Sequence, residues 1–302
     1  MKTAFCTIST NDHLFKVDAL FESLRQVGCN SEMICLATQP GEENLKNGRL
    51  IRPGNIDLGE AERFLKNKHN ETSDELRWSL KPVLISALLE EYDKVIYLDN
   101  DIFFFNSPAF IWKELDDNDV LLTPHHYPRD PKKNQNWLEA NFKVGLYNAG
   151  FIGVNKQAKH VIDWWAECCQ YRCEKSWFRG LFDDQKYLDL VPIIHPNTKI
   201  MEHQGCNIAG WNIDVCKRTQ SGTGDVTIND NWPIIFVHFN GFSVRAIING
   251  EDSALTPHLN HYVSSLQNFN SVLVLDDLWK ENTTWDRLKL SAWRFLNSFN
   301  RS

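Results

Sequence analysis

The first forty residues alternate between apolar runs and a segment with helical spacing. Residues 4–9 and 33–37 are short, apolar and β-branched, which is typical of strands. Between them, residues 14–27 place apolar side chains at helical intervals, and Gly28 follows as a stop signal. A strand, a helix and a second strand in so short a stretch predict the start of a parallel α/β sheet.

The same alternation continues along the chain. Residues 79–91 favour a helix with Pro82 in its first turn, and residues 125–141 predict a long polar loop that could cover a site. Further strands are expected at 94–98, 120–123, 151–154, 191–195, 225–228 and 234–239, and further helices at 157–173 and 259–266. We therefore predict one α/β domain over residues 1–250 and a C-terminal helical extension over residues 251–302.

Composition narrows the class of protein. The 302 residues include 39 acidic and 32 basic side chains, a net charge of -7, so we expect no nucleic-acid partner. The N-terminus lacks the pattern of a signal peptide, and no apolar run approaches the ~20 residues of a membrane span. Eight cysteines in a chain of this length are no disulfide framework. These features predict a reduced, cytoplasmic protein.

The sharpest motif is Asp99-Asn100-Asp101, directly after the apolar run of residues 95–98. In parallel α/β proteins, ligands bind beyond the carboxyl ends of strands. Two carboxylates one residue apart at such an end could converge on Mg²⁺ or Mn²⁺, which completes its shell with water and substrate phosphates. The motif thus suggests a metal-held diphosphate, although a solvated turn is the commoner explanation for two acids near a strand end.

Other segments could join this motif. Lys81, near the predicted start of a helix, could face a phosphate together with free backbone N–H groups. Asn148 and Gly150 precede a strand, where the backbone can approach a ligand closely. Asp184-Gln185 open a predicted helix, where an acidic N-cap is the simpler explanation. His238 lies in an apolar run and is either a core histidine or a neutral metal ligand.

Taken in order, these segments resemble the nucleotide-sugar glycosyltransferases of the GT-A fold, in particular bacterial relatives of glycosyltransferase family 8. The resemblance covers about residues 1–245. The matching segments are the helix, strand and Asp-x-Asp region of residues 80–102, the Asn-x-Gly of 146–154, the Asp-Gln pair of 184–185, the Asn-x-Ala-x-Trp-Asn of 207–212 and the His-Phe-x-Gly of 238–241.

The resemblance implies a GT-A fold and transfer of a sugar, with retention, from a nucleotide-diphosphate donor such as a UDP-sugar to a glycan such as lipopolysaccharide or capsule. It implies that Asp99, Asp101 and His238 hold Mn²⁺ (or Mg²⁺) and that Asp184 and Gln185 act at the donor sugar. The residues that it assigns to donor binding are Thr7, Ser9, Asn11, Arg77, Lys81, Asn100, Asn148, Gly241 and Arg245.

One departure from the family pattern concerns a phosphate-binding lysine. The family usually continues His-Phe-x-Gly-x-x-Lys-Pro-Trp, but here Gly241 is followed by Phe242-Ser243-Val244-Arg245. The lysine is absent from its place, and Arg245, one residue later, could substitute for it.

Residues 285–301 form a second functional candidate. Apolar side chains recur there at helical spacing, accompanied by four basic residues and several aromatic ones. Such a helix could lie on the inner face of an anionic membrane and bring the protein to a lipid-linked glycan acceptor. The alternative is a helix that packs its apolar face on its own domain.

Two other classes of protein remain open from the residues alone. Haloacid-dehalogenase-type phosphohydrolases also use Asp-x-Asp after a strand, but a small or hydroxyl residue usually follows, whereas Ile102 follows here. A sugar nucleotidyltransferase would need a Gly-rich phosphate loop near the N-terminus, and none is present. The last alternative is a non-catalytic module that binds carbohydrate or nucleotide-sugar.

Overall fold

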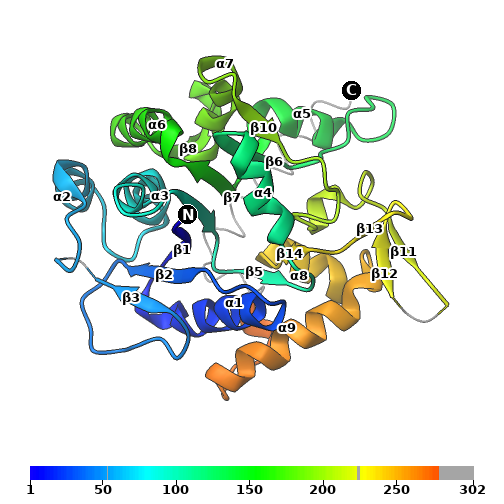
Figure 1. The fold of residues 1–302 in the computed structure, drawn as a ribbon. Coiled ribbons are helices and arrows are strands. Elements are labelled where there is room, and N and C mark those ends of the chain that lie inside the picture. Colours follow the sequence, from blue (N-terminus) through cyan, green and yellow to red (C-terminus); the bar gives the residue numbers. More distant parts are fainter. Residues whose placement is uncertain (53, 223–224, 279–302) are drawn as a thin grey trace.

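A seven-stranded mixed sheet forms the centre of the computed structural model, which describes residues 1–52, 54–222 and 225–278 (Figure 1). From one edge to the other the strands are β10 (Thr198–Ile200), β6 (Val120–Pro124), β7 (Tyr147–Asn155), β4 (Lys94–Leu98), β1 (Thr3–Ser9), β2 (Glu32–Ala37) and β3 (Arg49–Ile51). Strand β7 runs antiparallel to its neighbours β4 and β6, and the other adjacent pairs of this sheet are parallel. The predicted α/β fold with a mainly parallel sheet is confirmed.

Helices cover both faces of this sheet, because the strands carry apolar side chains on both. In β1, Ala4, Cys6 and Ile8 join one core cluster and Phe5 joins the other, as the alternation of a strand requires. The first cluster packs under α2 (Gly59–Lys68), α3 (Asp74–Leu88) and α6 (Lys159–Tyr171), and the second under α1 (Leu14–Gln26) and α4 (Ala109–Asp117). Figure 1 shows α2, α3 and α6 grouped on one side of the sheet.

Helix α3 begins five residues earlier than the sequence pattern predicts. Ser73 caps it by accepting a hydrogen bond of 3.2 Å from the backbone N–H of Leu76. Pro82 therefore lies inside the helix and not in its first turn, so the carbonyl of Trp78 lacks the usual helical donor. Lys81 likewise lies in the middle of α3, and the predicted place of this lysine at a helix N-terminus is wrong.

Two further segments differ from expectation. Residues 191–195 do not form a strand, because Pro192 starts the short helix α7 (Val191–Ile194), and the strand comes later as β10. The predicted loop of residues 125–141 contains most of helix α5 (Gln135–Lys143). Asn134 caps α5 by accepting a hydrogen bond of 3.2 Å from the N–H of Trp137.

Shorter strands lie outside the central sheet. They are the antiparallel pair β5 (Ile102–Phe104) and β14 (Phe236–His238), the pair β8 (Glu174–Ser176) and β9 (Leu181–Asp183), and the three-stranded sheet of β11 (Arg218–Gln220), β12 (Val226–Ile228) and β13 (Trp232–Pro233). The strands expected near residues 225–228 and 234–239 are confirmed. Helix α8 (Gly241–Ile248) follows β14 directly.

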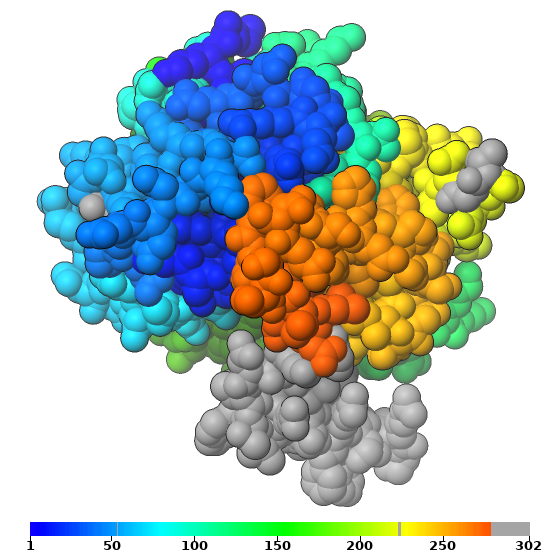
Figure 2. Space-filling view, turned by 90° about the horizontal axis from the view of Figure 1, so that it is seen from below, coloured from blue at the N-terminus to red at the C-terminus, as the bar shows by residue number. Residues whose placement is uncertain are grey.

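The described part of the C-terminal extension packs on the rest of the chain. Helix α9 (Thr256–Phe269), predicted from residues 259–266, contacts α1, and Leu259, Tyr262 and Leu266 join a core cluster with Phe103. Figure 2 shows this orange segment against the blue N-terminal part. The segment 285–301 lies outside the described residues. Within the described residues, no helix combines the length and the apolar character that crossing a membrane requires.

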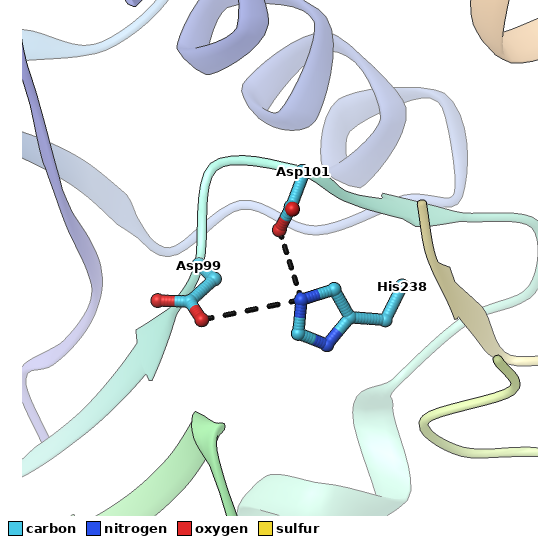
Figure 3. A group of neighbouring side chains, drawn as sticks. All are labelled: Asp99, Asp101 and His238. Carbon is cyan, nitrogen blue, oxygen red and sulfur yellow. Dashed lines mark ion pairs between the residues drawn. The ribbon is translucent and has the colours of Figure 1, made fainter. Parts of the chain in front are cut away.

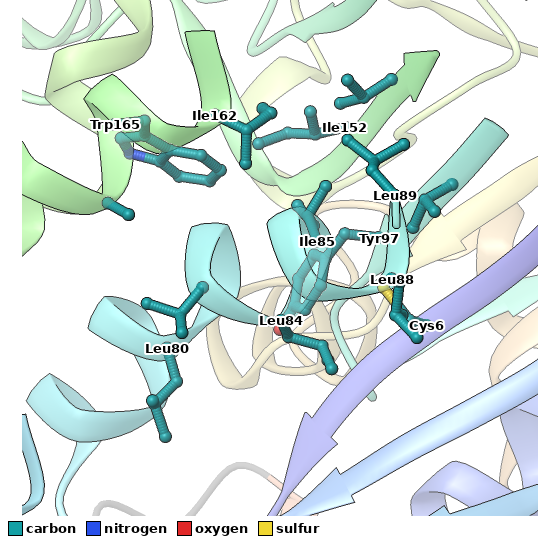
Figure 4. Close-up of a cluster of buried hydrophobic side chains, with 14 of the residues drawn as sticks. Cys6, Leu80, Leu84, Ile85, Leu88, Leu89, Tyr97, Ile152, Ile162 and Trp165 are labelled. Carbon is teal, nitrogen blue, oxygen red and sulfur yellow. The ribbon is translucent and has the colours of Figure 1, made fainter. Parts of the chain in front are cut away.

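The largest core cluster lies between α3, α6 and the sheet (Figure 4). Leu84 of α3 is fully buried there, together with Ile85, Ile162 and Trp165. Since the packed interior closes only partly around a deleted side chain, shortening a residue at this position leaves a cavity.

We predict that Leu84→Ala lowers the free energy of unfolding by about 2–5 kcal/mol. Leu84→Met, which nearly conserves volume, should cost less than about 1.5 kcal/mol. Urea unfolding followed by circular dichroism measures both values. Equal losses for the two variants would contradict the tight packing described here.

Candidate functional site

The Asp-x-Asp motif forms a turn that two neighbouring strands hold in place. It connects the end of β4 to the start of β5, so Asp99 and Asp101 project from one short turn. The N–H of Asp99 donates to the carbonyl of Gly150 (2.8 Å), and the N–H of Phe239 donates to the carbonyl of Asp101 (2.8 Å). Because β14 pairs with β5, His238 lies opposite Ile102 and beside both carboxylates.

Asp99, Asp101 and His238 converge as the sequence predicts (Figure 3). The Nε2 atom of His238 lies 3.0 Å from Oδ1 of Asp101 and 4.0 Å from Oδ2 of Asp99. One ligand atom of each residue lies within 4.8 Å of the others. Two carboxylates with one imidazole form a donor set suited to Mn²⁺ or a similar divalent cation, so the residues fit the predicted metal.

The ring of His238 is oriented by a contact on its other nitrogen. Nδ1 lies 3.4 Å from Oδ1 of Asn207, and Trp211 packs on the ring at 5.3 Å between centroids. A proton on Nδ1 leaves the lone pair of Nε2 for a cation. Burial lowers the pKa of His238, but the charges of Asp101 and Asp99 outweigh this effect and raise it above its ordinary value. A bound cation replaces the proton that these carboxylates attract.

Gly150 forms the wall of this cluster. A Cβ atom at this position would lie 2.6 Å from Oδ1 of Asn148, 2.7 Å from Cε1 of His238 and 2.9 Å from Oδ2 of Asp99. Only glycine leaves room for all three side chains. The sequence predicted a close backbone approach here, but not that the approach is to the metal ligands themselves.

Lys81 lies between two carboxylates. Its Nζ atom is 3.1 Å from Oδ1 of Asp99 and 3.3 Å from Oδ2 of Asp184, and it also donates to the carbonyl of Ala149 at 3.3 Å. Tyr97 donates a further hydrogen bond of 3.1 Å to Oδ1 of Asp99. Burial raises the pKa of Asp184 to about 8, although Lys81 opposes the rise. Lys81 thus connects the three candidate metal ligands to Asp184.

Asp184 lies directly before a 3₁₀ helix that begins at Gln185, as expected of this pair, and both residues are buried. The indole N–H of Trp165 donates to the carbonyl of Asp184 (2.8 Å), and the side-chain amide of Gln185 donates to the carbonyl of Val144 (3.3 Å). Asp183 has a positive φ of 44°, a strained conformation of the kind found at functional sites.

Asn148 contacts a histidine that the sequence reasoning did not single out. Its Nδ2 lies 3.3 Å from Nε2 of His125, whose Nδ1 lies 3.0 Å from the carbonyl of Gly145. Burial lowers the pKa of His125 to about 3, so its ring is neutral at physiological pH. The signal that could have found it is a histidine directly after the strand of residues 120–124, at the same edge of the sheet.

The predicted nucleotide-binding residues lie at the end of β1. Asn100 donates a hydrogen bond of 3.2 Å to Ser9, which connects the Asp-x-Asp turn to this strand. Asn11 and Arg77 line a pocket of about 470 Å³ together with residues 10, 12 and 13. Thr7 is buried within β1, and its hydroxyl has no hydrogen-bond partner in the described part of the chain.

The remaining two predicted donor residues belong to α8. Gly241 begins this helix three residues after His238, and Asn240 caps it by accepting a hydrogen bond of 2.8 Å from the N–H of Ser243. Arg245 is half-buried one turn further on. The structure therefore places both on the segment that follows the metal-ligand strand.

Comparison with known proteins gives matches over most of the chain. The model of a family described as Glycosyl transferase family 8 matches residues 46–181. The uncharacterized protein YfnF of Bacillus subtilis (strain 168) is 30% identical over 258 residues, which cover 82% of this chain and 84% of YfnF. Mouse xyloside xylosyltransferase 1 aligns with a TM-score of 0.49 at 14% identity, over 80% of this chain and 99% of that one. The galactosyltransferase LgtC aligns with a TM-score of 0.48 at 17% identity, over 79% of this chain and 86% of that one.

Gly150→Ala should weaken Mn²⁺ binding by at least about tenfold, because the added methyl group displaces Asp99 or His238 from the ligand cluster. Isothermal titration calorimetry with Mn²⁺ measures this. Gly222→Ala, where a Cβ meets no atom of the described residues within 4 Å, is the control. Unchanged Mn²⁺ affinity in Gly150→Ala would exclude these residues as the metal site.

Acid should destabilise the protein through His125. Its folded pKa of about 3 lies below the ordinary value of 6.5, so the unfolded chain binds the extra proton and stability falls as the pH drops from about 6.5 towards 3. Between pH 7 and pH 5, this one group should cost about 2 kcal/mol. Urea unfolding of the wild type and of His125→Gln at both pH values measures the difference, which should be smaller in the variant.

Proposed function

Because the chain belongs to glycosyl transferase family 8, we propose that it transfers a sugar from a nucleotide-diphosphate donor, a UDP-sugar in the first instance, in a metal-dependent reaction. The observation that carries the proposal is the convergence of Asp99, Asp101 and His238 beside a pocket at the end of β1. Family membership favours sugar transfer over the phosphohydrolase and the non-catalytic module that the residues alone left open.

The donor lies along the edge of the sheet where β1 and β4 end. Its base and ribose occupy the pocket lined by Asn11 and Arg77, and its diphosphate reaches the Asp-x-Asp turn, which the Asn100–Ser9 hydrogen bond joins to that pocket. When bound, Mn²⁺ held by Asp99, Asp101 and His238 would attract the diphosphate and act as a Lewis acid towards the leaving group.

The sugar lies on the other side of the metal ligands. Asn148, Asp184 and Gln185 are buried there, and each can hydrogen-bond a sugar hydroxyl. Lys81 fixes Asp99 and Asp184 in their relative positions because it contacts both. The chain's own residues thus orient the anomeric carbon between the metal ligands and the Asp-Gln pair, and this preorganisation lowers the barrier.

The acceptor is a glycan, such as a lipopolysaccharide or capsular chain, and transfer retains the configuration at the anomeric carbon. Family membership supports transfer of a sugar, and the resemblance of residues 1–245 to the family suggests this acceptor and retention. A lipid-linked acceptor is consistent with the basic, aromatic segment of residues 285–301, which lies outside the described residues.

Asp101→Asn should reduce the rate of sugar transfer by at least about 100-fold. Loss of one carboxylate charge weakens metal binding, and without the metal the negative charge of the diphosphate is not compensated. Release of nucleoside diphosphate from a set of nucleotide-sugars with Mn²⁺ measures the rate. Asp117→Asn, an exposed aspartate on α4, is the matched control. EDTA should abolish the wild-type reaction and Mn²⁺ should restore it, so full activity in EDTA would refute the metal dependence.

A thermal-shift screen identifies the donor. A ligand that binds only the folded state stabilises it by about 2.7 kcal/mol at a hundredfold excess over its Kd. We expect one nucleotide-sugar to raise the melting temperature of the wild type in the presence of Mn²⁺ and much less in its absence. No shift with any nucleotide-sugar would contradict the proposed function.

A further inference from the structure

The diphosphate of a nucleotide-sugar carries two negative charges that the metal site alone cannot balance. A divalent cation held by Asp99, Asp101 and a neutral His238 has a net charge of zero. Further positive charge must therefore come from side chains that can reach the diphosphate.

The cations expected there are already engaged. Lys81 is shared between Asp99 and Asp184. Arg77 is paired with Asp74 and donates to the carbonyl of Thr72 (3.2 Å). The lysine that usually follows His-Phe-x-Gly is replaced by Val244, which is fully buried, and Arg245, one residue later, has an interaction of its own.

Lys16, unlike these residues, is a cation near the start of α1 without a direct partner in the described part of the chain. It is half-buried in the first turn of α1, directly after the pocket-lining residues 10–13, and α1 packs on β5, the strand that follows Asp101. In Figure 3 the blue helix α1 passes above the turn of Asp101. Its ammonium group makes no hydrogen bond or ion pair of its own within the described residues.

The charge of Lys16 is coupled to that of Asp101 and to those of two pocket-lining residues, Asp12 and Arg77. Burial lowers the pKa of Lys16, and the charges of Asp101 and Asp12 partly offset this effect, while Arg77 adds to it. Burial raises the pKa of Asp101, but the contact with His238 and, to a smaller extent, the charge of Lys16 outweigh this effect and lower it to about 2. A cation withdrawn from water without a direct counter-ion is unfavourable until an anion joins it.

We propose that Lys16 binds the diphosphate of the donor and replaces the lysine missing from the His-Phe-x-Gly segment. Lys16 follows the pocket-lining residues 10–13 on a helix that contacts β5, the strand directly after Asp101. A diphosphate that extends from a nucleoside in the pocket to a metal on the Asp-x-Asp turn would run along this segment. The inference rests on the proposed function, because it needs a nucleoside diphosphate in this site.

The test compares a nucleoside diphosphate with its nucleoside. The wild type is first titrated with UDP, CDP, GDP and dTDP in the presence of Mn²⁺, and the best binder is kept. Its Kd and that of the matching nucleoside are then measured for Lys16→Met, Lys16→Arg and Lys113→Met. Lys113 is an exposed lysine on α4 and serves as the matched control.

Loss of a charge-assisted contact should affect only the phosphate-bearing ligand. In Lys16→Met we expect the diphosphate to bind at least about tenfold more weakly, which corresponds to ~1.4 kcal/mol, and the nucleoside to bind within about twofold of the wild type. Lys16→Arg keeps the charge and should restore binding to within about threefold. Lys113→Met should match the wild type for both ligands.

Two results would overturn the inference. One is a Lys16→Met protein that binds the diphosphate as tightly as the wild type. The other is an equal loss for diphosphate and nucleoside, which would give Lys16 a structural role. The melting temperature of each variant without ligand shows whether the variant is folded. A wild type that binds none of the four diphosphates contradicts the proposed function itself, and the inference falls with it.

Discussion

Lys81 binds Asp99 and Asp184 at once, and this buried contact joins the parts of the molecule that form the site. The lysine belongs to α3, Asp99 follows β4, and Asp184 precedes the 3₁₀ helix of residues 185–190. Removing one partner from such a group leaves an uncompensated charge away from water, at a cost of about 3–5 kcal/mol. The pairing therefore fixes the helix, the strand end and the Asp-Gln pair relative to one another.

The reversed direction of β7 explains why distant motifs meet. The carboxyl ends of parallel strands lie at one edge of a sheet, and an antiparallel strand contributes its first residues to that edge. Leu98 at the end of β4 pairs with Phe151 near the start of β7, so residues 148–150 lie beside the Asp-x-Asp turn. One strand in the opposite direction thus brings Asn148 and Gly150 to the metal ligands.

Local sequence signals predicted much of this site. An apolar run that ends in Asp-x-Asp, a histidine in a short strand and the Asp-Gln pair each carry a recognisable pattern, and the structure brings Asp99, Asp101 and His238 together. The strands β4 and β14 were predicted because their apolar runs reflect burial. Strand β5 was not predicted, and β7 begins at Tyr147, so Asn148 and Gly150 lie inside that strand, whereas the sequence had predicted them before it. These signals are short-range, and they do not depend on how the helices pack.

Long-range features left no such signal. Lys81 lies in the middle of α3 because the helix begins at the Ser73 cap, several residues before its apolar pattern becomes visible in the sequence. His125 and Asn207 orient Asn148 and His238 from positions 23 and 31 residues away, and a single sequence does not show such pairs. The steric need for Gly150 depends on three side chains that meet only in the folded chain.

The charged residues of the site form two groups. In one group the charges already have partners within the chain, and in the other they need a bound ligand. On one side, Lys81 already contacts Asp99 and Asp184 without a ligand, which suits this side to holding a neutral sugar. On the other side, Asp99 and Asp101 lie close enough to repel each other, and Lys16 makes no ion pair within the described residues. A bound cation relieves the repulsion between the two carboxylates, and a bound diphosphate gives Lys16 a partner of opposite charge. Metal and nucleotide should therefore bind cooperatively, because each reduces the electrostatic cost of binding the other.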